Sequence, residues 1–427
     1  MEKILQYMWQ FRMWGSSEKV LSDGRRVMLL DPGKLNADAG PDFFNAKVII
    51  DGVEWAGNVE VHVKASDWKR HGHHNDAAYD NIILHVVGID DEVICRRDGT
   101  PIPQLLMPLT PEIARKYTQL VEGGAAVRCG AYLSEVPSLI MSDWLETLAF
   151  ERLQSKTSRF VSLLEQNHGD WEEVCYVFLA RSLGFGLNSQ PFEMLARSLP
   201  LSVLRKHSDS RLQLEALLFG QAGMLDVTEH VMDEYYQLLC REYFFMMRKY
   251  SLRPMERHLW KFARTRPANF PHRRIALLAE FCYGGFAMMR QMIEAKGDVD
   301  KLRNLFAVEM SDYWSTHSSF EVASQRNSLS LTRNSIDLLM INLVAPLYYA
   351  YGGWSGDTTI EDMSMDLLSS IKAESNSIIS RWAAVGVTAD NALRSQALLQ
   401  LTKEYCDNRK CLYCRIGNRM LRIAGKK

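Results

Sequence analysis

Hydrophobic and polar residues alternate along residues 57–64, and strict alternation of this kind predicts a β-strand. One face of this strand would carry valines, and the other would carry Asn58, Glu60, His62 and Lys64. A half-exposed antiparallel strand with a solvated polar face is one interpretation. The other is that a carboxylate, an imidazole and an ammonium group line a functional site.

The hairpin before this strand decides whether a second carboxylate joins Glu60. The pattern predicts strands at Phe43–Ile50 and Val53–Lys64, with a turn at Asp51-Gly52. A two-residue turn would place Asp42 opposite Val61, on the wrong face. A three-residue loop ending at Gly52 would place Asp42 opposite Glu60, and a bulge near Gly57 would do the same. We predict the Asp42–Glu60 pair from the three-residue loop and keep the bulge as the alternative.

The neighbouring segments complete a small mixed sheet. Residues 81–89 are apolar on both faces, which is typical of a central strand covered on both sides. The pattern predicts a helix over residues 2–14 and further strands at Arg25–Leu30, Glu92–Arg96 and Ile102–Met107.

The pattern changes after residue 110. Thr110-Pro111 is typical of a helix start, with Thr110 as the cap and Pro111 at the first helical position. Beyond it, apolar residues recur at helical spacing and strand patterns almost vanish. A chain of 427 residues is longer than a single hydrophobic core usually supports, so more than one domain is expected. We predict an α+β protein, with a mixed-sheet domain flanked by helices at residues 1–110 and a large irregular all-α domain at residues 111–427.

Composition restricts the partners and the compartment. The chain has 50 basic and 51 acidic residues, so any nucleic-acid surface must be a local patch. We find no signal peptide and no apolar run of about 18 residues, and we therefore expect no membrane partner. Eight cysteines in a chain of this length fit a reducing compartment, so we predict a cytoplasmic protein.

Asp42 and Glu60 together would bind a hard divalent cation, Mg²⁺ or Mn²⁺, through oxygen ligands. His62 or Lys64, further along the same face, could then polarise a phosphate or orient a water molecule. This is the arrangement required for metal-assisted hydrolysis of a phosphodiester.

Pro41-Asp42, followed by Glu60, His62 and Lys64, resembles the PD-(D/E)XK nuclease superfamily. The resemblance implies a core of a helix, a mixed sheet and a covering helix, with Asp42 and Glu60 as metal ligands. The chain departs from the superfamily at His62, where the superfamily has lysine. Lys64, one step further along the same face, is the candidate substitute. A wider set of residues is similar to an uncharacterised bacterial domain-of-unknown-function family: Asn36, Gly40–Phe43, Gly57–Glu60, Asp67-Trp68 and Leu84–Val87.

A basic segment lies within the helical part. Residues 253–274 hold seven lysines and arginines against the single acid Glu256, with aromatic residues between them. Such a segment could bind the phosphate backbone of DNA or RNA. The residues predicted to do so are Arg264, Arg266, Arg273 and Arg274. The alternative is a solvated helix face, or arginines that cap neighbouring helices.

Three cysteines near the C-terminus, Cys406, Cys411 and Cys414, have the spacing C-x4-C-x2-C. A C-x2-C pair can bind one metal from a tight turn, and the third thiolate can close on it. We predict zinc or an iron–sulfur cluster here, with Cys129 as the fourth ligand. Reduced cysteines without a metal are the alternative.

Three functions are consistent with these residues. The first is a divalent-metal nuclease acting on DNA or RNA, and the second is a catalytically inactive nuclease-like fold that serves as a binding or scaffolding module. The third is a transition-metal hydrolase with a histidine-rich site. Its weakness is that residues 71–74 are expected to form a mobile loop. The candidate ligands of this third site are His62, His71, His73, His74 and His85.

Overall fold

The computed structural model describes residues 1–13, 18–36, 38–226, 231–263, 269–324 and 328–424, and it has a mixed α+β fold. The chain divides into two compact units. Unit 1 combines three separate segments, Met1–Trp144, Arg381–Val387 and Leu401–Lys427. Unit 2 consists of Leu145–Ser380 and Thr388–Gln400. The division falls inside the long helix α4 (Ser138–Gln166).

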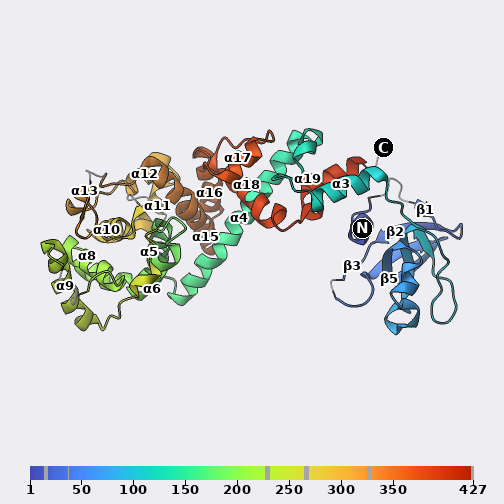
Figure 1. Ribbon diagram of the computed structural model, residues 1–427, viewed down its shortest axis with the longest axis horizontal. Helices are drawn as coiled ribbons and strands as arrows, with labels where there is room; N and C mark the ends of the chain where they lie inside the picture. Colours follow the sequence, from blue (N-terminus) through green and yellow to red (C-terminus); the bar gives the residue numbers. More distant parts are fainter. Residues whose placement is uncertain (14–17, 37, 227–230, 264–268, 325–327, 425–427) are drawn as a thin grey trace. The chain divides into compact units, whose positions relative to one another are not determined.

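A mixed sheet forms the core of unit 1 (Figure 1). The strands follow the order β1-β2-β4-β5-β6-β7, and β3 pairs with the outer part of β4. The pairs from β1 to β5 are antiparallel, whereas β5–β6 and β6–β7 are parallel. The strands are β1 (Glu18–Val20), β2 (Arg26–Asp31), β3 (Lys34–Leu35), β4 (Phe43–Ile50), β5 (Val53–Lys64), β6 (Ile82–Ile89) and β7 (Gln104–Leu106).

The β4–β5 hairpin has a two-residue turn, so the predicted three-residue loop is wrong. Ile50 pairs with Val53, and Asp51 and Gly52 both have positive φ, as a type I′ turn requires. The register then shifts by one residue between Ala46 and Phe43, where Asn45 adopts a left-handed φ of 57°. This bulge in β4, opposite the region of Gly57, brings Asp42 level with Glu60.

Helices cover both faces of the central strands. Helix α1 (Glu2–Gln10) packs on β5 and β6, and Leu5 fills the space beside Gly88. Helix α2 (Asp67–Arg70) lies in the crossover that parallel pairing of β5 and β6 requires. Its Trp68 joins a core cluster with Val87. Since Val87 and Gly88 are neighbours in a strand, α1 and α2 lie on opposite faces.

The predicted strand at Glu92–Arg96 does not form. The side chain of Gln104 takes up backbone groups that a strand partner would bind: it accepts from the Ile94 amide (2.9 Å) and donates to the Glu92 carbonyl (3.0 Å). Only an isolated bridge, between Cys95 and Pro101, pairs this segment with another.

The remainder of unit 1 is helical. Helix α3 (Pro111–Glu122) starts as predicted, because the Thr110 hydroxyl accepts from the Ile113 amide. The C-terminal helix α19 (Arg415–Ala424) packs against α3 (Figure 1). Asn418 of α19 hydrogen-bonds to Tyr7 of α1. Short helices complete the unit: η1 (His73–Asn75), η2 (Ala77–Tyr79), η3 (Gly130–Glu135), η8 (Leu401–Cys406), η9 (Cys411–Tyr413) and part of α17 (Ser377–Ala383).

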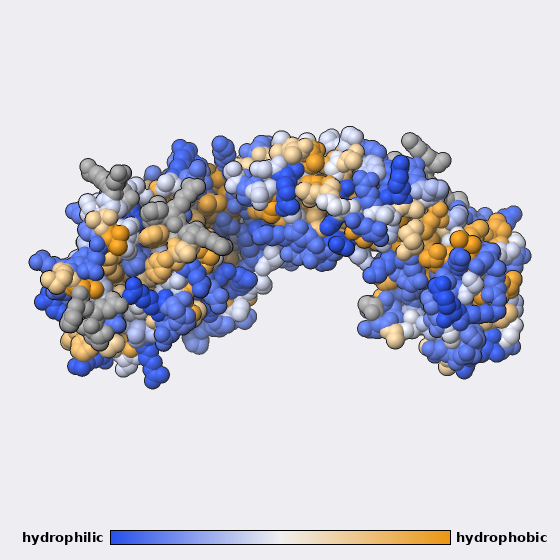
Figure 2. Space-filling view, in the orientation of Figure 1, coloured by the Kyte–Doolittle hydropathy of each residue, from blue (hydrophilic) through white to orange (hydrophobic). Residues whose placement is uncertain are grey.

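Unit 2 is almost entirely helical, apart from the strand pair β8 (His317–Ser319) and β9 (Val322–Ala323). On the face shown in Figure 2, hydrophilic residues dominate and hydrophobic residues form separate patches. Across the described ranges, no helix is both long and apolar enough to span a membrane. The helices of unit 2 are α5 (Trp171–Leu183), α6 (Ser189–Ser198), α7 (Leu201–Leu204), η4 (Arg205–His207), α8 (Arg211–Gln221), α9 (Glu234–Tyr250), η5 (Arg257–Leu259), α10 (Pro271–Cys282), α11 (Met288–Ala295), α12 (Val299–Leu305), α13 (Tyr313–Thr316), α14 (Arg333–Leu339), η7 (Met340–Val344), α15 (Ala345–Ser355), α16 (Thr358–Ser370) and α18 (Ala392–Gln400).

Candidate metal site

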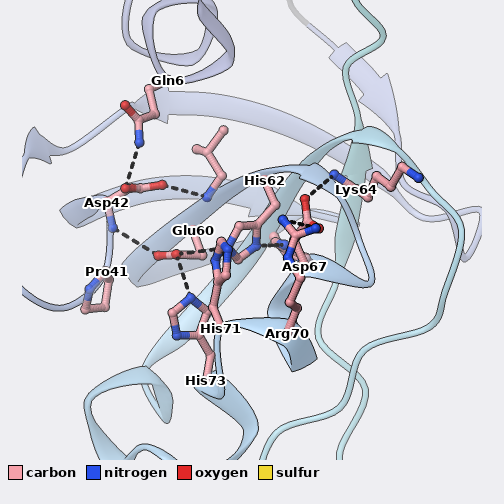
Figure 3. A network of polar contacts seen from close by, with 12 residues as sticks. Gln6, Pro41, Asp42, Glu60, His62, Lys64, Asp67, Arg70, His71 and His73 are labelled. Atoms are coloured by element: carbon pink, nitrogen blue, oxygen red, sulfur yellow. Dashed lines mark hydrogen bonds and ion pairs between the residues drawn. The ribbon is translucent and has the colours of Figure 1, made fainter. Parts of the chain in front are cut away.

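Asp42 and Glu60 form a tightly connected pair at the β4–β5 edge (Figure 3). The backbone amide of Asp42 donates to Glu60 Oε2 (3.1 Å), and the amide of Val61 donates to Asp42 Oδ2 (3.0 Å). Gln6 of α1 donates to the other oxygen, Asp42 Oδ1 (2.9 Å). These bonds fix both carboxylates in the register that the Asn45 bulge creates.

Two imidazoles lie beside the carboxylate of Glu60, and a third contacts one of them. His62 Nε2 lies 3.5 Å, and His73 Nε2 3.3 Å, from Glu60 Oε1. His71 Nδ1 lies 3.1 Å from His62 Nε2. One ligand nitrogen from each of His62, His71 and His73 can be chosen so that all three lie within 4.8 Å of one another. The crossover between β5 and β6 thus folds over the strand and is not the open loop that the sequence suggested.

His85 on β6 fixes the ring of His62. Its Nε2 lies 2.9 Å from His62 Nδ1, so one of these two nitrogens carries the shared proton. If His62 donates from Nδ1, its Nε2 carries a lone pair that faces His71 Nδ1 (3.1 Å) and Glu60 Oε1 (3.5 Å). A metal-binding histidine commonly donates its other nitrogen in this way.

The face that carries Glu60 and His62 is buried, so the interpretation of a solvated polar face is wrong for this part of the strand. Glu60 is 5% exposed and His62 is 1% exposed. Burial, followed by the charge of Glu60, raises the pKa of Asp42 to about 7, and burial raises the pKa of Glu60 to about 8. Burial, followed by the charge of His85, lowers the pKa of His62 to about 2. Burial therefore disfavours the charged forms of Asp42, Glu60 and His62 in the absence of a cation.

The donor set fits a divalent transition metal. The nitrogens of His62, His71 and His73 lie within 4.8 Å of one another, and Glu60 Oε1 lies 3.5 and 3.3 Å from those of His62 and His73. Asp42, held against Glu60 by its backbone amide, would add a second carboxylate. His73 Nε2 is buried and makes no well-aligned hydrogen bond, although Glu60 is near. A mixed oxygen and nitrogen set suits Mn²⁺, Fe²⁺ or Zn²⁺ better than Mg²⁺, which prefers oxygen ligands.

Lys64 and His74 lie outside this arrangement. The side chain of Lys64 is exposed and extends away from Asp42 and Glu60 in Figure 3. Its backbone amide instead donates to Asp67, which also pairs with Arg70. His74 contacts the side chain of its neighbour Asn75. The structure thus brings His62 to the carboxylates and leaves Lys64 at the end of the strand.

A family model described as a protein of unknown function (DUF2851) matches residues 2–377. The chain belongs to this family. The match covers the whole mixed sheet and most of unit 2, and it includes every residue of the candidate metal site. No curated protein and no solved structure matches the sequence.

The basic segment of this DUF2851 protein does not form the predicted phosphate surface at Arg273 and Arg274. Both arginines are buried, at 3% and 6% exposed. Arg273 donates to the backbone carbonyls of Trp314 and Ser328, and Arg274 donates to Asn269 (2.5 Å). Their guanidinium groups hydrogen-bond within the interior of unit 2. The prediction that these two arginines bind nucleic acid is therefore wrong. The other two predicted residues, Arg264 and Arg266, lie outside the described residues.

The structure brings Cys129 to the three C-terminal cysteines. Arg128, the neighbour of Cys129, donates from Nη1 to the backbone carbonyl of Cys406 (2.7 Å). The charges of Cys411 and Cys414 contribute to raising the pKa of both Cys129 and Cys406, after the larger effect of burial. All four thiols are free in the structure. Cys129, the predicted fourth member, therefore lies beside Cys406, Cys411 and Cys414, although 276 residues lie between it and the first of them.

Three residues at the metal site were not anticipated from the sequence. Gln6 contacts Asp42 from α1, and Tyr79 stacks on His73 with ring centroids 3.9 Å apart. Trp68 contacts the rings of His62, His73 and His85. The sequence offers no signal for Gln6, because its contact depends on how α1 packs on the sheet.

Proposed function

We propose that this DUF2851 protein is a divalent-metal-dependent hydrolase that cleaves phosphodiester bonds in DNA or RNA. One observation carries the proposal: two carboxylates and two imidazoles converge from β4, β5 and the crossover helix η1. Asp42 and Glu60 occupy the positions that the resemblance to PD-(D/E)XK nucleases assigns to metal ligands. The order of α1, the antiparallel strands, α2 and the parallel strand β6 also agrees with the core which that resemblance implies.

Within this proposal, Asp42 and Glu60 hold Mn²⁺ or another divalent transition ion, and His62 and His73 complete its ligands. When bound, such an ion lowers the pKa of a water molecule and polarises a phosphoryl oxygen. His85 Nε2 accepts a hydrogen bond from the Nδ1–H of His62, so His62 Nε2 is available as a ligand. Gln6 and the Val61 amide hold Asp42 in place.

His71 is the member of the cluster that reaches solvent. It is exposed, whereas His62 and Glu60 are buried, so substrate would approach from the side of His71. His62 takes the position of the superfamily's lysine, and Lys64 has no role at the metal.

A second candidate is a hydrolase whose metal is bound mainly by imidazoles. The grouping of His62, His71 and His73 favours it, since three imidazoles suit Zn²⁺. This site overlaps the first, so the preferred metal distinguishes the two. Zinc-dependent activity that survives the loss of Glu60 would support the second candidate.

The deciding experiment measures cleavage of labelled single- and double-stranded DNA and RNA by the full chain with Mn²⁺, Mg²⁺ or Zn²⁺. We expect cleavage with Mn²⁺ that falls to background in Glu60→Gln while the circular dichroism spectrum is unchanged. His62→Ala should lose about 10- to 100-fold or more in activity, because it removes a ligand. The matched control, Lys64→Ala in the same strand, should stay within about twofold, because its side chain is exposed.

Two outcomes would contradict the proposal. A wild-type protein that binds Mn²⁺ but cleaves no nucleic acid would indicate a binding module with lost chemistry. Failure of Mn²⁺ to bind, measured by calorimetry with Glu60→Gln as the reference, would remove the metal site altogether. Equal losses in His62→Ala and Lys64→Ala would contradict the assignment of His62.

A further inference from the structure

The four cysteines of unit 1 form a second cluster, separate from the candidate metal site. Cys129 precedes η3, Cys406 ends η8, and Cys411 and Cys414 lie on and after the tight turn η9. Cys411 and Cys414 are buried, and Cys129 and Cys406 are half-buried. Such a group of thiols, from distant parts of one chain, is the ligand set of a metal centre.

Hydrogen-bond donors surround the sulfur atoms. The backbone amides of Ile416 and Gly417, at the start of α19, donate to Cys414 Sγ and lower its pKa, although burial raises it more. The guanidinium of Arg128 donates to Cys411 Sγ in the same way. Donors directed at sulfur favour the thiolate, which is the form that binds metal.

Trp144 adds a buried hydrogen-bond donor beside Cys414. Its side chain is 4% exposed, and its indole N–H has no well-aligned hydrogen-bond partner in the described part of the chain. That N–H lies close enough to Cys414 Sγ to lower the pKa of this thiol. A buried donor that lacks a firm partner is costly, and an anionic sulfur would satisfy it.

The backbone of α19 at Gly417 lies directly against the backbone of η9 at Cys411. A Cβ atom on Gly417 would lie 2.1 Å from the carbonyl oxygen of Cys411, so only glycine lets α19 start this close to η9. In the absence of a metal, the thiol of Cys411 donates to the Leu120 carbonyl (3.2 Å). Metal binding would remove this proton and release Cys411 from Leu120.

The spacing of the sulfurs indicates the class of metal centre. One zinc ion with Zn–S bonds of about 2.3 Å needs its four sulfurs roughly 3.8 Å apart. Within the described ranges, these cysteines do not form a group whose ligand atoms all lie within 4.8 Å of one another. An iron–sulfur cluster distributes its four thiolates over several irons and therefore accepts a wider set.

We infer that Cys129, Cys406, Cys411 and Cys414 bind an iron–sulfur cluster that joins the first and last segments of unit 1. Cys129 belongs to the segment before unit 2, and the other three belong to the segment after it. The cluster thus closes a loop that contains all of unit 2. Its role is structural, and the proposed hydrolysis does not depend on electron transfer.

The test uses the full chain, purified without oxygen and reconstituted with ferrous iron and sulfide under reducing conditions. We expect equal amounts of iron and acid-labile sulfide, about two to four of each per chain. The visible absorption spectrum should be that of an iron–sulfur protein. Cys414→Ser and Cys129→Ser should each lose at least about tenfold in bound iron, because a four-thiolate site loses a ligand. The matched control is Cys95→Ser, since Cys95 is an exposed cysteine of the same unit outside the cluster.

A second variant keeps all four cysteines, so its result does not depend on whether the cysteine variants fold. Trp144→Phe keeps an apolar ring but removes the indole N–H, so the cluster should still form and its reduction potential should become more negative. The inference would be overturned by wild-type protein that takes up neither iron nor sulfide, or by one zinc per chain in place of iron. Iron loss in Cys95→Ser equal to that in Cys414→Ser, or an unchanged potential in Trp144→Phe, would also overturn it.

Discussion

Glu215 of α8 is a buried carboxylate in unit 2 that the proposed chemistry does not use. It is 3% exposed and accepts hydrogen bonds from the hydroxyl of Tyr235, Ser311 Oγ (3.0 Å) and Trp314 Nε1 (3.3 Å). Burial raises its pKa to about 7, from an ordinary value of 4.5. The folded chain therefore holds a proton there that the unfolded chain releases.

This difference predicts how pH affects the stability of unit 2. Between pH 4.5 and about pH 7 the unfolded state ionises first, so rising pH favours unfolding, by on the order of 3 kcal/mol across the window. Glu215→Gln removes this dependence. Urea unfolding followed at both ends of the window should show wild type losing stability relative to the variant as pH rises. Parallel pH profiles would contradict the shifted pKa.

At the scale of single residues, alternation was enough to place Glu60 and His62 on one face of a strand. It also placed Lys64 there, but could not show that its long side chain, at the end of β5, extends into solvent. The contacts of Gln6 with Asp42 and of His85 with His62 join residues far apart in the sequence. They depend on tertiary packing, which periodicity does not encode.

At the scale of elements, the bulge at Asn45 determines whether the carboxylates meet. A left-handed φ is tolerated by asparagine and glycine, whereas a β-branched residue there is strained by about 1–2 kcal/mol. Asn45→Val should therefore favour a straight strand, in which Asp42 would face Val61, and should weaken Mn²⁺ binding. Asn45→Gly should retain the bulge and bind Mn²⁺ like wild type.

Deletion of Asn45 makes this prediction sharper. The bulge sets two residues of β4 against one of β5, so removing Asn45 would leave a regular ladder with Asp42 still opposite Glu60. We expect the deletion variant to bind Mn²⁺ in calorimetry, although Asn45→Val does not bind it well. Strong binding by Asn45→Val, or none by the deletion variant, would contradict the bulge as the cause of the register.

The strands of the hairpin could be predicted to the residue, but its register could not be derived uniquely. A three-residue loop and a bulge give the same partner for Asp42, and the sequence contains glycine at both candidate places. The failed strand at Glu92–Arg96 has a different cause, because the pattern there was adequate. Gln104, ten residues beyond Ile94, supplies the hydrogen bonds that a neighbouring strand would have supplied.

At the scale of the whole molecule, unit 1 depends on its last segment. Helical periodicity identifies α19, but it does not reveal that this helix packs on α3 and reaches Tyr7 of α1. A chain ending at Gln400 lacks α19 and three of the clustered cysteines. We expect such a chain to lose hydrogen-exchange protection in α1 and α3 and to keep it in α8 and α10 of unit 2. Equal protection of α1 in both chains would contradict this dependence.

The division of unit 1 into separated segments affects the order in which the protein can mature. A ribosome makes the strands of the sheet first, then all of unit 2, and only then residues 401–427. Helix α1 contacts Asp42 through Gln6 and Asn418 through Tyr7. Its contact with Asn418 can therefore form only when translation is nearly finished. During that interval α1 would lack its contact with Asn418, so the site proposed to bind a metal would be completed late in synthesis.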